Sequence, residues 1–244
     1  MKIRHYPQAL LVLIITPLLT LIASLAALFL IFGCRVAEGT VQIVPRIWAR
    51  MICWCAGVKV TVSGQEKLDA NQTYIFAANH QSQFDIPAMQ GYLGFDFRWM
   101  AKKELFAVPV FGAGMRACGY VAVDRSRGRQ ALQSLNEAAE QINAGTSVII
   151  FPEGTRSADG QLQPFKSGAM VLAIKARVPI VPVAILGTHE ILAKGKLRSQ
   201  PGRILIRLGK PLDTMQFKLA DKQDLAARLH QEVAGLLAAA GPEQ

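Results

Sequence analysis

One short segment carries the residue types needed to move a proton. Residues 79–85 read NHQSQFD, with a histidine and an aspartate five positions apart. The ordinary pKa of histidine lies near neutrality, so His80 could take up and return a proton at working pH. The Asp85 carboxylate could reach back to the imidazole, fix its tautomer and stabilise the imidazolium. The pattern predicts a general base, although a loop histidine can equally be structural.

A second segment could hold an anion. Residues 151–157 read FPEGTRS and follow a short apolar run. Arg156 offers a planar fork suited to a phosphate or carboxylate. Gly154 and Thr155 could present backbone N–H groups to the same oxygens. Glu153 could hold Arg156 in place or bind a substrate hydroxyl, and a simple Glu–Arg salt bridge closing a turn is the alternative.

Two more cations are candidates for the same site. Arg125 ends the apolar segment GYVAVDR, and Lys166 precedes a helical pattern that begins near Ser167. Surface ion pairs are the alternative for both.

These residues need a framework, and the sequence predicts an α/β domain. Apolar runs predict strands at 58–62, 73–78, 97–101, 120–123, 147–151, 180–186 and 203–208. Helical patterns lie between them, from Ser126 to residue 142, from Ser167 to residue 174 and over 219–240. Alternating strands and helices indicate a largely parallel, mixed sheet flanked by helices. Ligands bind outside the carboxyl ends of such strands, and both charged segments directly follow predicted strands.

The N-terminal part of the chain differs from the rest in composition, because it is almost wholly apolar. No charged residue occurs from Tyr6 to Cys34, a run long enough at about 1.5 Å per residue to cross a hydrocarbon core of about 30 Å. It could also enter and turn back near Pro17. A cleaved signal peptide is the rival reading, but its apolar core is usually only about 7–15 residues.

Residues 39–56 form the next N-terminal segment and are amphipathic. They could lie at a membrane interface, with Trp48 and Trp54 among the headgroups and Arg46 and Arg50 facing phosphates, or pack on the domain. We therefore expect residues 1–56 to form a helical membrane anchor and residues 57–244 the α/β domain.

The charge favours anionic partners. The 244 residues contain 27 Lys and Arg against 17 Asp and Glu, a net charge of +10. A run of basic residues without an intervening acid comprises Lys194, Lys196, Arg198, Arg203, Arg207 and Lys210. Beside a membrane anchor, an anionic membrane surface is the simplest partner. No nucleic-acid-binding motif accompanies the charge, and a solvated face remains open for the outermost residues.

The four cysteines do not suggest a metal. Cys53 and Cys55 have the wrong spacing for a zinc knuckle, and only four histidines are scattered along the chain. Reduced, structural thiols on the cytosolic side are the expected reading.

Four blocks together resemble the glycerolipid acyltransferase family. Residues 79–85 resemble its NHxxxxD block, residues 119–125 its GxxxxxR block, residues 153–156 its EGTR block and residues 178–185 its proline-containing fourth block, all in family order and spacing. The resemblance implies an α/β acyltransferase domain.

The same resemblance assigns residue roles. His80 and Asp85 are catalytic, and Arg125, Glu153, Gly154, Thr155, Arg156 and Lys166 surround the acceptor phosphate. Asn79 and Ser82 support the first block, and Pro182 shapes the acyl-donor side.

The implied reaction transfers a fatty acyl group from acyl-CoA or acyl-ACP to the hydroxyl of lysophosphatidic acid, giving phosphatidic acid. A thioester is already activated, so no covalent intermediate and no cofactor are needed; indeed no GxSxG nucleophile elbow is present. The expected location is the inner membrane, with the catalytic domain on its cytoplasmic face.

Other readings stay open at this point. The acceptor could be another lysophospholipid, glycerol 3-phosphate or a lyso-ornithine lipid, because these share the same chemistry. The chain could also be a catalytically silent lipid-binding protein, since a fold does not guarantee activity. A membrane-bound nucleic-acid protein is suggested by charge alone.

Overall fold

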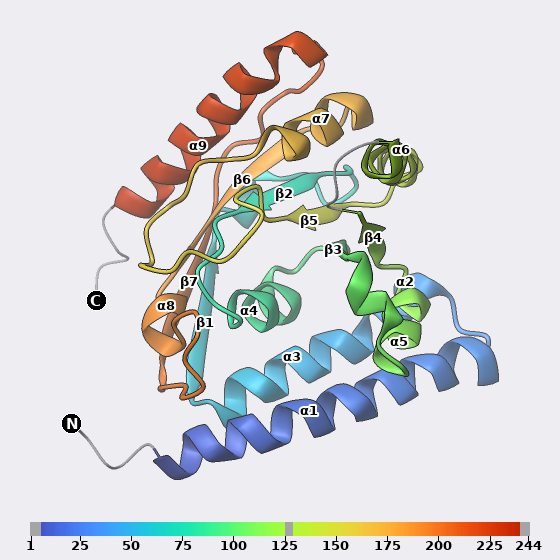
Figure 1. The fold of residues 1–244 in the computed structure, drawn as a ribbon, viewed down its shortest axis with the longest axis vertical. Coiled ribbons are helices and arrows are strands. Elements are labelled where there is room, and N and C mark those ends of the chain that lie inside the picture. The colour runs from blue at the N-terminus through green and yellow to red at the C-terminus, as the bar shows by residue number, and fades with distance from the viewer. Residues whose placement is uncertain (1–5, 125–128, 240–244) are drawn as a thin grey trace.

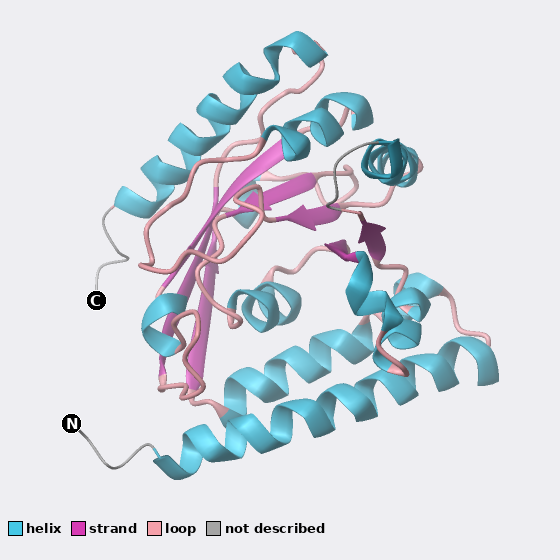
Figure 2. Ribbon diagram, viewed as in Figure 1, coloured by secondary structure: helices cyan, strands magenta, loops and turns pink. Residues whose placement is uncertain are grey.

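The computed structural model describes residues 6–124 and 129–239, and within them seven strands form a single sheet (Figures 1 and 2). The strands are β1 (Val58–Ser63), β2 (Ile75–Ala78), β3 (Arg98–Lys102), β4 (Val121–Val123), β5 (Val148–Ile150), β6 (Ile180–Leu186) and β7 (Gly202–Leu208). Their order is β1-β7-β6-β2-β5-β3-β4. Only β6 and β7 pair antiparallel in this described sheet. The predicted strands and the α/β class are confirmed.

Helices cover both faces of the sheet (Figure 1). The α-helices are α1 (Tyr6–Leu28), α2 (Glu38–Val41), α3 (Ile43–Cys55), α4 (Asp85–Tyr92), α5 (Phe111–Ala117), α6 (Arg129–Asn143), α7 (Ser167–Ala176), α8 (Thr188–Ile191) and α9 (Lys222–Ala238). The shorter turns are the π-helix η2 (Phe29–Gly33) and the 3-10 turns η3 (Gln65–Lys67), η4 (Lys103–Ala107) and η5 (Leu219–Asp221). Helices α6, α7 and α9 lie on one side, and α1, α3, α4 and α5 lie on the other.

Strand β2 shows how the sheet separates two hydrophobic cores. Successive strand side chains point to opposite faces. Ile75 and Ala77 therefore join the core beneath α6, α7 and α9, whereas Phe76 and Ala78 join the core beneath α3 and α4. A strand buried on both faces explains the continuous apolar run in the sequence.

Helix α3 joins the domain through one face and leaves another exposed. Its buried side includes Ile52 and Cys53, which belong to the same core as the strands. Its exposed side presents an apolar row at helical spacing, made of Ile43, Ile47, Met51 and Trp54. The amphipathic segment therefore packs on the domain and still offers an apolar surface.

Of the two alternatives for residues 39–56, the contacts of Arg46, Trp48 and Arg50 fit packing on the domain. The Trp48 indole donates a hydrogen bond to Thr20 Oγ1 of α1 at 3.1 Å. Arg46 donates to the carbonyl oxygen of Phe95 and Arg50 to that of Gly91. These side chains satisfy carbonyls of the domain, and Trp54, 80% exposed, is the tryptophan of this helix that points outward.

Parallel strand order brings distant segments to one edge of the sheet. Strand β2 pairs with both β5 and β6, and β3 pairs with β5, all in parallel. The loops that follow β2, β5 and β3 therefore leave the sheet side by side. The two charged segments of the sequence are two of these loops.

Gly187 makes a tight turn at the end of β6 and supplies a stability prediction. Its φ is +86°, and a Cβ atom there would lie 2.2 Å from the carbonyl oxygen of Arg203. Left-handed backbone costs an L-residue about 1–2 kcal/mol, and an unrelieved clash adds about 1–3 kcal/mol. We expect Gly187→Ala to lower the free energy of unfolding, measured in urea and neutral detergent, by about 3 kcal/mol.

Gly145→Ala is the matched control. Its φ is +101°, but nothing lies within 4 Å of the added Cβ, so only the backbone cost applies. Equal losses in the two variants would contradict the steric argument.

Candidate active site

The first residue of α4 organises the loop that follows β2, the His80 loop (residues 79–84). Asp85 Oδ2 accepts hydrogen bonds from His80 Nδ1 at 2.7 Å and from the backbone N–H groups of Gln81 and Ser82 at 2.8 Å each. The Asp85 side chain is fully buried. An ionised carboxylate only accepts, so Nδ1 is the donor of this contact, and in a neutral imidazole Nε2 then keeps its lone pair. The predicted contact between His80 and Asp85 is thus present.

Aromatic rings fix the plane of the imidazole. The Phe151 ring stacks on the His80 ring with centroids 3.8 Å apart and planes 9° apart. Trp99 continues the stack on Phe151 with a centroid distance of 5.8 Å. The Trp99 indole N–H donates to Gln90 Oε1 at 2.6 Å, which anchors the stack in the domain.

Glu153 ties the His80 loop to the loop after β5, the Arg156 loop (residues 151–157). Its Oε1 accepts the backbone N–H of His80 at 2.8 Å, and the His80 carbonyl accepts the N–H of Ser157 at 2.8 Å. The structure shows no ion pair between the described residues Glu153 and Arg156. Glu153 therefore fixes the histidine backbone instead of closing a turn with Arg156.

The environment of Glu153 favours its neutral form. Burial raises the pKa of Glu153 to about 7, against the opposing effect of hydrogen bonds from the backbone of His80 and Gln163. The side chain is only 2% exposed. The cause is desolvation, which penalises the charged carboxylate.

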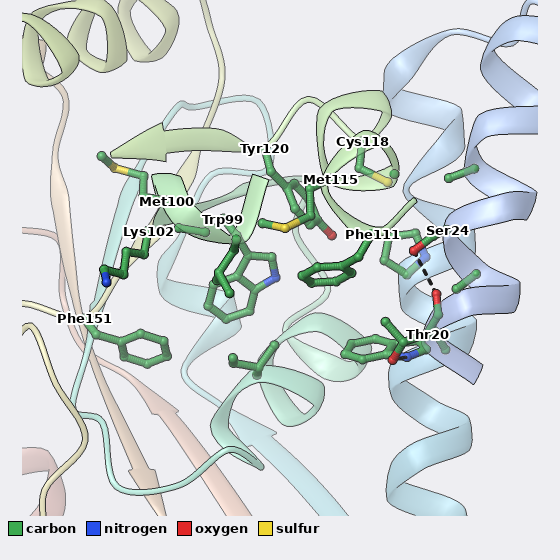
Figure 3. Close-up of a pocket in the computed structure, with 18 of the residues that line it drawn as sticks. Thr20, Ser24, Trp99, Met100, Lys102, Phe111, Met115, Cys118, Tyr120 and Phe151 are labelled. Carbon is green, nitrogen blue, oxygen red and sulfur yellow. Dashed lines mark hydrogen bonds between the residues drawn. The ribbon is translucent and has the colours of Figure 1, made fainter. Parts of the chain in front are cut away.

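His80 and the Arg156 loop line a cavity of about 440 Å³. Figure 3 shows other parts of its wall, among them Trp99, Phe111 and Phe151. The end formed by the His80 loop and the Arg156 loop carries the polar lining residues His80, Thr155 and Arg156, and Lys102 also lines the cavity. The remaining walls are mainly apolar and come from β3, α5, α3 and α1. They include Trp99, Met100, Leu105, Phe111, Met115, Trp48, Ala23 and Ala27. The N-terminal helix is thus part of the cavity wall.

The predicted acceptor-site residues divide into three groups. Gly154, Thr155 and Arg156 line the cavity. Lys166 is exposed and passes over Gly154, where an added Cβ would lie 2.7 Å from its Nζ, so it borders the Arg156 loop without lining the cavity. Arg125 lies outside the described residues.

The motif-supporting residues are structural. Asn79 forms two hydrogen bonds with the backbone of Ile185, donating at 2.9 Å and accepting at 2.7 Å. The Ser82 hydroxyl donates to the Leu192 carbonyl at 2.7 Å. Pro182 lies inside β6, away from the cavity lining, and its carbonyl accepts the Gly209 N–H. These contacts hold β2, β6 and the loop after α8 in register.

Sequence reasoning missed three residues of the site. Trp99 and Phe151 form the aromatic stack, and Lys102 lines the cavity with its Nζ 3.4 Å from Glu104 Oε1. A usable signal existed for Lys102, because it directly follows an apolar strand as the other charged segments do. The stacking partners have no such signal, since apolar runs indicate burial without naming the neighbour.

The arrangement suits proton removal from an amphiphilic anion. An imidazole, a guanidinium and an ammonium group belong to residues that line one mainly apolar cavity. Within the described ranges, no group of three or more His, Cys, Asp or Glu side chains could hold a metal ion.

Known proteins share this arrangement of sequence and fold. The model of the Acyltransferase family matches residues 59–186. A 1-acyl-sn-glycerol-3-phosphate acyltransferase of Cocos nucifera is 34% identical over 181 residues, which cover 74% of this chain and 58% of the relative. A chloroplastic 1-acyl-sn-glycerol-3-phosphate acyltransferase of Brassica napus, BAT2, is 36% identical over 197 residues, covering 75% and 56%.

A solved structure extends the likeness to the whole fold. The crystal structure of the 1-acyl-sn-glycerophosphate (LPA) acyltransferase PlsC from Thermotoga maritima matches with a TM-score of 0.80 and 28% identity, over 99% of both chains. The chain spans just over half the length of the two curated plant relatives. On the family match and these identities, the chain belongs to the Acyltransferase family.

Proposed function

We propose that this chain transfers a fatty acyl group from a thioester donor to the free hydroxyl of lysophosphatidic acid, forming phosphatidic acid. The observation that carries the proposal is the convergence of the His80–Asp85 pair and Arg156 on the polar end of one apolar cavity. The relatives named above are 1-acyl-sn-glycerol-3-phosphate or 1-acyl-sn-glycerophosphate acyltransferases by name, which supports the proposal.

The proposed reaction proceeds by direct attack. His80 Nε2 removes the proton of the acceptor hydroxyl as its oxygen forms a bond to the thioester carbonyl carbon. The tetrahedral intermediate collapses, the carbon–sulfur bond breaks, and the protonated imidazole returns its proton to the leaving thiolate. Asp85 stabilises the transient imidazolium without taking the proton. The thioester of CoA or of acyl carrier protein supplies the acyl group, and no further cofactor takes part.

The cavity offers cationic side chains for the phosphate of the acceptor and apolar walls for the hydrocarbon chains of the substrates. A volume of about 440 Å³ lies within the range of about 300–1,000 Å³ typical of small-molecule sites. Arg156 and Lys102 face the phosphate, because guanidinium and ammonium groups form charge-assisted hydrogen bonds with its oxygens. The apolar walls take up hydrocarbon. A silent lipid-binding protein would need no oriented base, so the complete His80–Asp85–Phe151 arrangement favours the enzyme.

The first test is acyl transfer itself. Purified protein is offered lysophosphatidic acid with acyl-CoA or acyl-ACP, and the products are identified by mass spectrometry. We expect phosphatidic acid from the unaltered chain and a kcat about 10²–10⁴-fold lower in His80→Ala, the usual effect of losing general base catalysis. Circular dichroism checks that the variant is folded. Turnover near the unaltered rate in folded His80→Ala would refute the mechanism, and lipid binding without product would favour the silent protein.

We further propose that Glu153 positions His80 rather than the acceptor, and its titration gives a test. The unfolded glutamate has a pKa of about 4.5, whereas burial raises the folded pKa to about 7. Between these values the folded state binds more protons, so the free energy of unfolding falls as the pH rises through this window.

Glu153→Gln is neutral at every pH and keeps an oxygen for the His80 N–H. We expect its stability relative to the unaltered chain to rise between pH 4.5 and 7, by on the order of 2–3 kcal/mol. Urea unfolding at several pH values measures the difference, and any constant cost of the amide cancels. A difference that does not vary with pH would contradict the proposal.

The N-terminal helix, we propose, lies in one leaflet on the cytoplasmic face instead of crossing the bilayer. The segment Ala9–Gly33 is long and apolar enough to span and is 17% buried in the fold. Yet α1 packs along α3 and α5, and a Cβ on Gly114 of α5 would lie 2.9 Å from Ser24 Cβ. If α1 crossed the bilayer, α3 and α5 would have to enter the hydrocarbon with it. The exposed apolar rows of α1 and α3 instead fit a position at the membrane–water interface.

Labelling from one side of the membrane distinguishes the two placements. Cys34 is exposed just beyond the helix, and Gln8→Cys in a Cys34→Ser background places a thiol near its start. We expect a membrane-impermeant maleimide to label both positions from the same face of sealed vesicles. Labelling from opposite faces would establish a spanning helix.

A further inference from the structure

The loop between α8 and β7, the Lys194 loop (residues 192–201), is built into the candidate site. Ser82 of the His80 loop donates to the Leu192 carbonyl and pairs with Ala193 as an isolated antiparallel bridge. The N–H of Gln200 donates to the Ile191 carbonyl at 2.8 Å and closes the loop at its base. The loop lies beyond the residues matched by the family model, which end at residue 186.

Lys194 extends from this loop to the Arg156 loop. Its Nζ donates to the Arg156 carbonyl at 2.8 Å and lies 3.4 Å from Thr155 Oγ1. Thr155 and Arg156 both line the cavity. The Lys194 ammonium therefore contacts two residues of the cavity wall, although Lys194 is not itself one of the lining residues.

The charge of Lys194 is not matched by an acid. Among the described residues, the ion pairs involve other cations, and the two contacts of Lys194 are with neutral oxygens. An ammonium has three N–H donors, so one donor remains after both contacts are counted. A carbonyl and a hydroxyl orient the group without neutralising it.

We propose that Lys194 is a ligand of the acceptor phosphate, acting with Arg156. This inference rests on the proposed function and adds to it a cation outside the four sequence blocks. A phosphate monoester has three acceptor oxygens and a charge of about −1.5 to −2 at neutral pH, so beside Arg156 and Lys102 it can accept a further N–H donor from Lys194. Arg156 grips two oxygens through its fork, and Lys194 supplies a point charge from the opposite loop.

The rival role is structural, in which Lys194 only holds the Arg156 loop in place. A structural lysine would affect every acceptor and the stability of the protein. A phosphate ligand affects the KM of phosphorylated acceptors and leaves the KM of the acyl donor unchanged. The readout must therefore separate acceptors with and without phosphate.

The experiment compares Lys194→Met, Lys194→Arg and Lys196→Met in neutral detergent micelles, which remove any anionic lipid surface. Lys196 is exposed in the same loop, and within the described part of the chain it forms no hydrogen bond with Thr155 or Arg156. Lys196→Met therefore controls for the loss of one positive charge. Arg156→Ala serves as the reference for loss of a phosphate ligand. Acceptors are lysophosphatidic acid and monoacylglycerol, and glycerol 3-phosphate serves as a competing, tailless phosphate.

We expect Lys194→Met to raise the KM for lysophosphatidic acid about tenfold, the effect of losing one hydrogen bond to a charged group. Its inhibition by glycerol 3-phosphate should weaken by a similar factor. Lys194→Arg should retain most of the affinity, and Lys196→Met should resemble the unaltered chain. Rates with monoacylglycerol, the donor KM and the urea midpoint should not change.

Three outcomes overturn the inference. An unchanged KM for lysophosphatidic acid removes Lys194 from the site, and equal losses with both acceptors make it structural. A defect seen only on vesicles containing anionic lipid assigns the lysine to the membrane surface. Failure of the unaltered chain to acylate lysophosphatidic acid would instead refute the proposed function, whatever the variants do.

Discussion

The Oδ2 atom of Asp85 accepts three hydrogen bonds in a position without solvent exposure, from the His80 imidazole and from the N–H groups of Gln81 and Ser82. A buried carboxylate is unfavourable without hydrogen bonds, and among the described residues Oδ1 of Asp85 has none. The three bonds to Oδ2 therefore carry the whole stabilisation of this carboxylate and dictate the path of the loop. With the contact to Asp85 made by Nδ1, Nε2 is the ring nitrogen that remains available to accept a proton. Phe151 and Glu153 then fix what remains free, the ring plane and the histidine backbone.

The order of the sheet makes this local geometry useful. Because β5 pairs with β2 in parallel, the Arg156 loop leaves the sheet beside the His80 loop. Two hydrogen bonds to the backbone of His80, from the Ser157 N–H and to the Glu153 carboxylate, join the two loops. Strand β3, on the other side of β5, adds Lys102 at the same edge. The polar end of the cavity is therefore assembled from the carboxyl ends of neighbouring strands, as expected of an open parallel sheet.

Helix α1 has two surfaces with different chemistry. Its outer side is a continuous set of exposed leucine and isoleucine side chains, whereas Thr20, Ser24 and Ala27 form part of the cavity wall. The hydroxyls of Thr20 and Ser24 are satisfied within the helix, by the carbonyls of Thr16 and Thr20. In the proposed membrane placement, one helix meets lipid on one side and encloses substrate hydrocarbon on the other. An amphiphile would then reach the base without its tail passing through water.

The charged run noted in the sequence does not behave as one surface. Arg207 is buried in β7 and donates to the carbonyls of Leu236 and Ala239, both at 2.7 Å, so it closes the end of α9. Lys194 instead reaches the candidate site. These cations are close together in the sequence. In the structure they lie in different parts of the molecule, because Arg207 is in strand β7 and Lys194 is in the loop that precedes this strand.

The sequence alone determined the strands, the α/β class and the His80–Asp85 pairing. Apolar runs and motif spacing encode these directly, because burial and local chain geometry depend on near neighbours. The tertiary structure decided the partners of Glu153, the aromatic stack on His80, and the positions of Lys102 and Lys194 at the cavity. It also turned Trp48, Arg46 and Arg50 toward the domain, although their helix is apolar on more than one side. Each of these depends on which strand or helix lies beside which, and hydrophobic periodicity shows that a residue is buried without showing what covers it.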